Sequence, residues 1–142
     1  QPTNDAEVKL KYLLKEAGFM DGKFQKQIRF NEPITLNHQI GSTTPDVFYA
    51  GDEDDEDDKG ICIYLDGMSS SLHGNRETAE KDHEIRSWLR NNGYEVIEIT
   101  AVELDDRKAM LRYFKKLAKY LSGKEFAQKI AKDGKWFDRV QD

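Results

Sequence analysis

The chain has 142 residues, of which 37% are hydrophobic and 35% are charged, and its formal net charge is −5 at pH 7. This length and composition fit one globular α/β or α+β domain with a core of its own. No apolar run approaches the roughly 20 residues that span a bilayer, and the single cysteine, Cys62, excludes an internal disulfide framework and a cysteine-based zinc site. We therefore expect a protein of a reducing compartment, the cytoplasm, that does not act at a membrane.

Charge is distributed unevenly along the chain. Residues 46–59 hold eight acidic residues and one lysine, whereas residues 107–139 hold eleven Lys or Arg against three acids. A basic segment of this kind points to nucleic acid, but Lys-rich solvated helix faces are also common in soluble proteins. Both interpretations stay open on charge alone.

The first half of the chain predicts one helix followed by short strands. Residues 4–18 carry apolar residues at helical spacing, and residues 24–40 alternate like a hairpin that turns at 31–33. A short strand follows Pro45, which stands at its entrance, and the acidic segment 51–60 predicts a solvated loop. The apolar positions are Leu10, Leu13, Leu14 and Ala17 in the helix, Phe24, Ile28 and Phe30 in the outgoing strand, and Ile34, Leu36 and Ile40 in the returning strand.

The second half of the chain predicts alternating strands and helices. The segment GICIYLD at 60–66 is almost continuously apolar, as in strands that are covered on both faces. A strand–helix–strand–helix order favours parallel pairing in this part of the sheet. The further elements are a helix at 76–92, a strand at 94–100, a helix that begins near Asp105 or Asp106, and a short helix in the tail before Trp136 and Phe137.

These elements predict an α/β fold with a central mixed sheet of four to five strands flanked by helices. We expect a single domain over residues 1–142, with a core at about 4–122 and a helical extension at 123–142. Because the chain opens on Gln1 rather than Met, we expect it to be part of a larger protein whose other domains are its partners.

Two carboxylates stand where apolar strands begin and end: Asp46 follows Pro45, and Asp66 ends the next strand. Strands adjacent in sequence usually pair, so these side chains are expected close together, where two bare charges repel and need a compensating partner. Mg²⁺ suits this arrangement, because it binds one or two carboxylates and completes its shell with water and phosphate. Such an ion, or Mn²⁺, supports phosphodiester hydrolysis.

Two further acids share the inward faces of the predicted helices. Glu7 on the first helix is placed to orient a metal-bound water, although Asn4-x-x-Glu7 also fits a capping-box variant. Asp82 shares a face with Leu89 on the second helix. It either points toward the sheet as an outer member of the site or pairs with Arg86 one turn later.

His73 and the basic last third supply groups for proton transfer and phosphate binding. His73 follows Asp66 by seven residues on a Ser/Gly loop and suits acid–base chemistry near neutral pH, whereas loop histidines often have no such role. Lys115, Lys116 and Lys119 are candidates for DNA phosphate contacts, which give salt-sensitive affinity without sequence choice.

Four motifs occur in an order that resembles the PD-(D/E)XK nuclease superfamily, which has the restriction-endonuclease-like fold. They are AEVKLKYLLKEAGF, TTPDVFY, ICIYLDG with a later LHG, and KDHEIRSWLRNNGYEVIEIT. The resemblance covers about residues 5–100 and is closest to the branch of the very-short-patch-repair endonucleases and their helicase-fused relatives. It implies an active site of Glu7, Asp46, Asp66 and His73, with Asp82 as a further member.

One position departs from the pattern of the superfamily. Its usual lysine, two residues after the second acid, would be Met68 if Asp66 is that acid. In the other alignment Tyr64 takes the acidic position and Asp66 the lysine position. In either case no lysine follows on the strand, so Lys81 reaches in, His73 activates the water, or the site has decayed.

The sequence therefore leaves two classes of function. The first is a Mg²⁺-dependent DNA endonuclease module of a larger DNA repair or anti-phage defence protein, as the helicase-fused relatives imply. The second is a nuclease-like domain without catalysis that binds DNA or a partner protein. Whether two copies assemble as a homodimer to cut two strands is left open.

Overall fold

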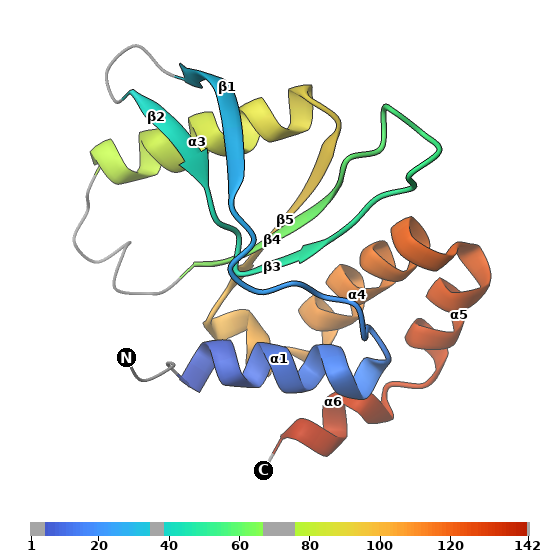
Figure 1. The fold of residues 1–142 in the computed structure, drawn as a ribbon. Helices are drawn as coiled ribbons and strands as arrows, with labels where there is room; N and C mark the ends of the chain where they lie inside the picture. The colour runs from blue at the N-terminus through green and yellow to red at the C-terminus, as the bar shows by residue number, and fades with distance from the viewer. Residues whose placement is uncertain (1–4, 35–38, 67–75, 142) are drawn as a thin grey trace. The chain divides into compact units, whose positions relative to one another are not determined.

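A computed structural model describes residues 5–34, 39–66 and 76–141 of the chain (Figure 1). The chain divides into two compact units. We call Gln1–Gly22 together with Ile99–Asp142 the helical unit, and Lys23–Glu98 the sheet unit. The protein is thus a mixed α/β protein, as its sequence predicts.

Helix α1 and the elements after residue 101 form the helical unit. They are α1 (Asp5–Ala17), the 3-10 helix η1 (Val102–Asp105), α4 (Arg107–Ser122), α5 (Lys124–Lys132) and α6 (Lys135–Val140). The α4 helix begins where the sequence predicts, because the Asp106 side chain caps it by accepting the Ala109 N–H at 3.3 Å.

Aromatic rings fill the core of the helical unit. Phe114 of α4 stacks on Trp136 of α6 with a ring-centroid distance of 4.7 Å, and Phe19 meets Phe114 edge-on at 5.3 Å. All three are buried together with the predicted inward leucines of α1. Trp136 and the following Phe137 therefore complete this core.

Five strands and one helix of the described chain belong to the sheet unit. Strands β1 (Ile28–Ile34) and β2 (Ile40–Thr43) form an antiparallel two-stranded sheet. A three-stranded sheet has the order β3 (Val47–Tyr49), β4 (Gly60–Asp66), β5 (Tyr94–Thr100). Helix α3 (Arg76–Asn91) lies between β4 and β5 in sequence. Strands β3 and β4 are antiparallel. Strands β4 and β5 start side by side, because the Lys59 N–H donates to the Gly93 carbonyl at 2.9 Å, and we infer parallel pairing across the α3 connection.

The predicted single sheet of four to five strands is wrong for the described residues, which form two sheets. Strands β2 and β3 are nearly continuous in sequence, but Thr44, Pro45 and Asp46 separate them, and Pro45 has no N–H to donate to a ladder. The expected turn at 31–33 is also wrong, because Asn31–Pro33 lies inside β1. Pro33 is tolerated there because the register with β2 shifts between Arg29 and Ile34.

Strand β4 is buried on both faces, as its apolar sequence predicts. Ile61 and Ile63 on one face are 0% and 1% exposed, and Cys62 and Tyr64 on the other are 0% and 8% exposed. The second face belongs to a cluster that includes Leu89 of α3 and Val96 of β5. The predicted hairpin position Leu36 lies outside the described residues, and Phe24 is 43% exposed rather than on a buried strand face.

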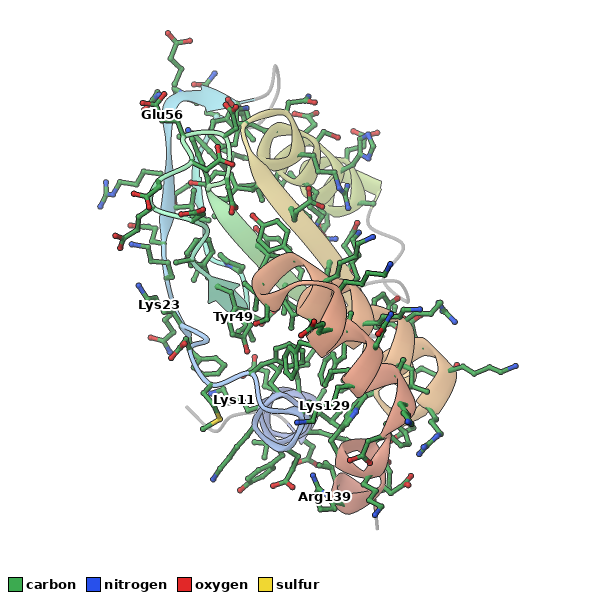
Figure 2. All side chains as sticks on the ribbon, turned by 90° about the vertical axis from the view of Figure 1, so that its right-hand side faces the viewer. Lys11, Lys23, Tyr49, Glu56, Lys129 and Arg139 are labelled. Atoms are coloured by element: carbon green, nitrogen blue, oxygen red, sulfur yellow. The ribbon has the colours of Figure 1, made fainter. Side chains whose placement is uncertain are left out.

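The acidic segment between β3 and β4 is an exposed loop, as expected. Its aspartates bond within the loop: Asp52 accepts from the Asp54 N–H and Asp55 accepts from the Asp57 N–H, each at 2.9 Å. Glu56 of this loop is exposed (Figure 2).

Candidate active site

Asp46 and Asp66 lie at adjoining ends of β3 and β4. Asp46 precedes β3, and Asp66 is the last residue of β4. The ladder between β3 and β4 begins at Val47↔Ile63, so Asp46 lies one residue before its first pair. The Asp46 carboxylate accepts the backbone N–H of Leu65 at 2.7 Å, directly beside Asp66. Asp46 therefore reaches the end of β4, the strand that Asp66 closes.

The charge of Asp66 is paired with Arg86 of α3. The guanidinium donates from Nη2 to one Asp66 oxygen at 3.0 Å and from Nη1 to the other at 3.2 Å, a bidentate pair. Arg86 is only 8% exposed, whereas the Asp66 side chain is 35% exposed. A protein cation thus compensates the carboxylate at the end of this core strand.

Glu98 of β5 is a second carboxylate partner of Arg86. Arg86 Nη1 donates to Glu98 Oε2 at 2.6 Å, and Arg90 Nη2 donates to Glu98 Oε1 at 3.1 Å. Burial alone would raise the pKa of Glu98, but the hydrogen bonds from Arg90 and Arg86 outweigh it and hold that pKa below its ordinary value. Arg86 therefore joins the ends of β4 and β5.

Asp82 lies one turn before Arg86 on α3 and faces the same charges. Burial raises the pKa of Asp82, the charges of Asp66 and Glu98 raise it further, and Arg86 and Lys81 oppose this. Asp82 thus lies within electrostatic reach both of Arg86 and of Asp66. The hydrogen bonds of the Arg86 guanidinium nevertheless go to Asp66 and Glu98.

The ring of Tyr64 supports Arg86 on the sheet side. The guanidinium carbon lies 4.5 Å from the centre of the Tyr64 ring, a cation–π contact. The Tyr64 hydroxyl and the Thr43 hydroxyl are hydrogen-bonded at 2.7 Å in a buried position. Burial raises the pKa of Tyr64, so this phenol stays neutral and acts as packing and hydrogen-bonding group.

Arg86 and Glu98 were not predicted as members of the site. Two signals in the sequence could have indicated them. Arg86 lies three residues before Leu89, on the inward helix face, and Glu98 continues the alternation of Tyr94 and Val96 on the buried face of β5.

Three further residues, Glu7, His73 and Lys81, were considered for the site. Glu7 is half-buried on α1 and belongs to the helical unit, whereas Asp46, Asp66 and Asp82 belong to the sheet unit. His73 lies outside the described residues. Lys81 is half-buried on α3.

The donor chemistry of Asp46 and Asp66 fits a hard divalent cation. Carboxylate oxygens are the ligands that Mg²⁺ prefers, and each oxygen accepts more than one bond, so pairing with Arg86 leaves lone pairs on the half-exposed Asp66. Within 5–34, 39–66 and 76–141, no three His, Cys, Asp or Glu side chains are arranged to hold a metal together. Two protein carboxylates with water and phosphate is the ligand set that this geometry allows.

The predicted phosphate-binding lysines form an exposed stripe on α4. Lys115, Lys116 and Lys119 are all exposed, and Arg107–Ser122 contains six basic residues and no acid. Lys129 on α5 is exposed as well (Figure 2). The helical unit therefore carries a positively charged helix surface.

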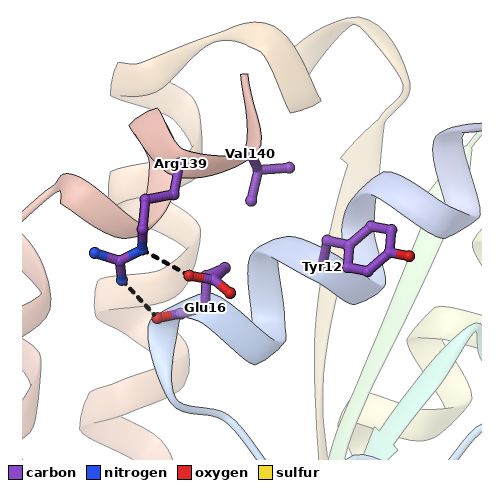
Figure 3. A pocket seen from close by; sticks show the side chains of 4 residues that line it. All are labelled: Tyr12, Glu16, Arg139 and Val140. Atoms are coloured by element: carbon purple, nitrogen blue, oxygen red, sulfur yellow. Dashed lines mark hydrogen bonds and ion pairs between the residues drawn. The ribbon is translucent and has the colours of Figure 1, made fainter. Parts of the chain in front are cut away.

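A separate hollow of about 450 Å³ lies between α1 and α6 of the helical unit (Figure 3). It is lined by Tyr12, Glu16, Arg139 and Val140, and Arg139 Nε donates to Glu16 Oε1 at 2.6 Å. None of the predicted site residues lines it.

Comparison of the chain with protein-family models, with curated proteins and with solved structures finds no match. Among the described helices, none has the length and apolar character needed to cross a membrane. The structure itself shows a mixed α/β protein in which the buried Arg86 binds two strand carboxylates, those of Asp66 and Glu98.

Proposed function

We propose that the chain is a Mg²⁺- or Mn²⁺-dependent DNA endonuclease module with a restriction-endonuclease-like core, part of a larger DNA repair or anti-phage defence protein associated with a helicase. The observation that carries the proposal is the 2.7 Å hydrogen bond from the Leu65 N–H to Asp46, beside Asp66. It supports a pair of carboxylates at adjoining strand ends, the arrangement that the superfamily resemblance implies.

Each acidic side chain of the proposed site has a definite support. The Leu65 N–H fixes one oxygen of Asp46, and the guanidinium of Arg86 orients both oxygens of Asp66. A bound divalent ion would supply a water of lowered pKa and stabilise the negative charge that develops at the phosphodiester. In this proposal His73 transfers the proton, and Asp82 is an outer member of the site.

DNA is the proposed substrate because of the basic surface of α4. Its exposed cations, Lys115, Lys116 and Lys119, are spaced along one helix, so that they can bind successive phosphates. Their charge attracts DNA of any sequence, and so this surface gives affinity and position rather than sequence choice.

Nicking of supercoiled plasmid tests the catalytic proposal. The wild-type chain with Mg²⁺ or Mn²⁺ is expected to nick, and Asp46→Asn is expected to lower the rate about a hundredfold or more, because it removes a charged metal ligand. Asp54→Asn is the matched control: the same change at an exposed loop aspartate, expected to keep the wild-type rate. Full nicking by Asp46→Asn would rule the proposed site out.

A second function is favoured by the bidentate contact of Arg86. Because Arg86 already compensates the charge of Asp66, this carboxylate needs no ion, and a nuclease-like domain that only binds DNA or a partner protein is consistent with this contact. Such a module would show no nicking, but it would retain DNA when Asp66 is changed to Asn. Changing Lys115, Lys116 and Lys119 to Gln would reduce the slope of log affinity against log salt by about three. An unchanged slope would place the DNA contacts elsewhere.

A further inference from the structure

We propose that Arg86 is a positioning residue that competes with the divalent cation for Asp66, with Glu98 as its second partner, so that the ion binds weakly until a phosphodiester is present. This inference rests on the proposed function, since it concerns the same ion.

Arg86 is bonded in a way that lets it change partners. Its Nη1 lies between Asp66, at 3.2 Å, and Glu98, at 2.6 Å, while Nη2 binds Asp66 alone at 3.0 Å. The side chain is more than nine-tenths buried, and its Nε has no hydrogen-bond partner among the described residues. A guanidinium that loses Asp66 to an ion therefore keeps its shorter bond, the one to Glu98.

The charges of the cluster explain why the ion alone would bind weakly. Asp66, Asp82 and Glu98 lie among the cations Lys81, Arg86 and Arg90, and Asp46, the proposed second metal ligand, adds a fourth carboxylate. One net negative charge remains, so a divalent ion would leave the cluster positive, and the negative charge of a phosphodiester would restore neutrality. Ion and DNA backbone should therefore bind cooperatively.

The affinity for Mn²⁺ tests this without any catalytic readout. We would titrate the full chain with Mn²⁺, without DNA, and count free ion by electron paramagnetic resonance. Arg86→Gln removes the competing cation and is expected to bind Mn²⁺ about tenfold more tightly than wild type. Arg90→Gln is the matched control, because Arg90 contacts Glu98 but not Asp66 in the hydrogen bonds of the cluster, and its affinity should change by less than threefold.

Glu98→Gln tests the same idea in the opposite direction and does not require the Arg86 variant to fold. This variant removes the negative charge of Glu98, the second partner of Arg86. Arg86 should then pair more strongly with Asp66, and the affinity for Mn²⁺ should fall severalfold. Equal or tighter binding by Glu98→Gln, or an unchanged affinity in a folded Arg86→Gln chain, would overturn the inference.

Asp46→Asn separates failure of this inference from failure of the proposed function. If Asp46→Asn loses Mn²⁺ while the Arg86 and Glu98 variants bind like wild type, the metal site stands and the competition is refuted. If Asp46→Asn binds like wild type, or no variant binds Mn²⁺, both proposals are refuted. A short double-stranded DNA should tighten Mn²⁺ binding to wild type, and this gain should shrink in Arg86→Gln.

Discussion

Replacing Asp66 by Asn is expected to destabilise the sheet unit, although the change removes an acid from an acidic cluster. Asparagine keeps the size of the side chain but loses the charge that compensates Arg86. Because Arg86 is 8% exposed, its guanidinium cannot recover this interaction from water. If Asp66 served only a metal, its removal in metal-free buffer would instead relieve repulsion with Asp46 and stabilise the fold.

The magnitude follows from the burial of the two partners. Breaking a fully buried ion pair costs about 3–5 kcal/mol, and breaking an exposed one costs about 1 kcal/mol or less. The Asp66 side chain is 35% exposed, and Arg86 keeps its bond to Glu98. We therefore expect a loss of about 2 kcal/mol in the free energy of unfolding, between these limits.

Cys62 provides an assay that reports on β4 alone. It is the single cysteine of the chain and is 0% exposed, and burial raises the pKa of its thiol to about 12. A thiol reagent therefore reacts only when β4 opens. In EDTA at pH 7, a loss of 2 kcal/mol corresponds to labelling about thirtyfold faster. Asp54→Asn should label like wild type, and equal or slower labelling of Asp66→Asn would refute the structural role of the ion pair.

Three further outcomes are expected from unfolding measurements. Glu98→Gln should lower the free energy of unfolding by about 1 kcal/mol at pH 7. Because folding lowers the pKa of Glu98, this contribution is present above about pH 4.5 and disappears as the pH falls through the folded pKa. A difference between variant and wild type that does not depend on pH would contradict this origin. Asp82→Asn should raise the free energy of unfolding by a few tenths of a kcal/mol at pH 7. The folded protein raises the pKa of Asp82, so the charged carboxylate is less favourable in the folded than in the unfolded chain. At pH 3, where the carboxyl group is protonated, thermal unfolding should show no gain. Gly60→Ala should lower the free energy of unfolding, measured in urea, by about 2 kcal/mol or more, because φ of Gly60 is +124° and a Cβ would lie 2.5 Å from the Tyr49 carbonyl oxygen. Gly41→Ala is the control, because a Cβ at Gly41 would have no atom within 4 Å.

Local periodicity predicted the helices α1, α3, α4 and α5 and the strands β4 and β5 closely, but it missed α6, which contains Trp136 and Phe137. Helix α1 spans Asp5–Ala17 where 4–18 was expected, and β5 spans the predicted 94–100. These elements depend on apolar spacing within one segment, which the sequence displays directly. Two errors have a different origin. Pro33 looked like a turn residue because its tolerance in β1 depends on a register shift against another strand, and the division into two sheets depends on pairing between segments.

The candidate site shows the same division between local and distant information. That Asp46 reaches the end of β4 was predictable, because it follows from antiparallel pairing of consecutive strands. Arg86 was considered only as the partner of Asp82 one turn away. In the structure its hydrogen bonds instead go to Asp66 and Glu98, which are 20 and 12 residues distant. A guanidinium pairs best with two parallel bonds to one carboxylate, and only folding brings such a carboxylate into position.

The contact of Arg86 also changes which residue carries the case for a metal ion. A carboxylate at the end of a buried strand first suggested an ion, but Arg86 supplies the compensating charge of Asp66 without one. The metal proposal therefore depends on Asp46 reaching the same strand end, through the Leu65 N–H. The two proposed functions, cleavage and binding alone, then differ in whether Arg86 exchanges its carboxylate partner. In the competition proposed above, a nuclease moves the Arg86 bonds from Asp66 toward Glu98 when the ion and DNA bind, whereas a binding module keeps the bidentate pair throughout.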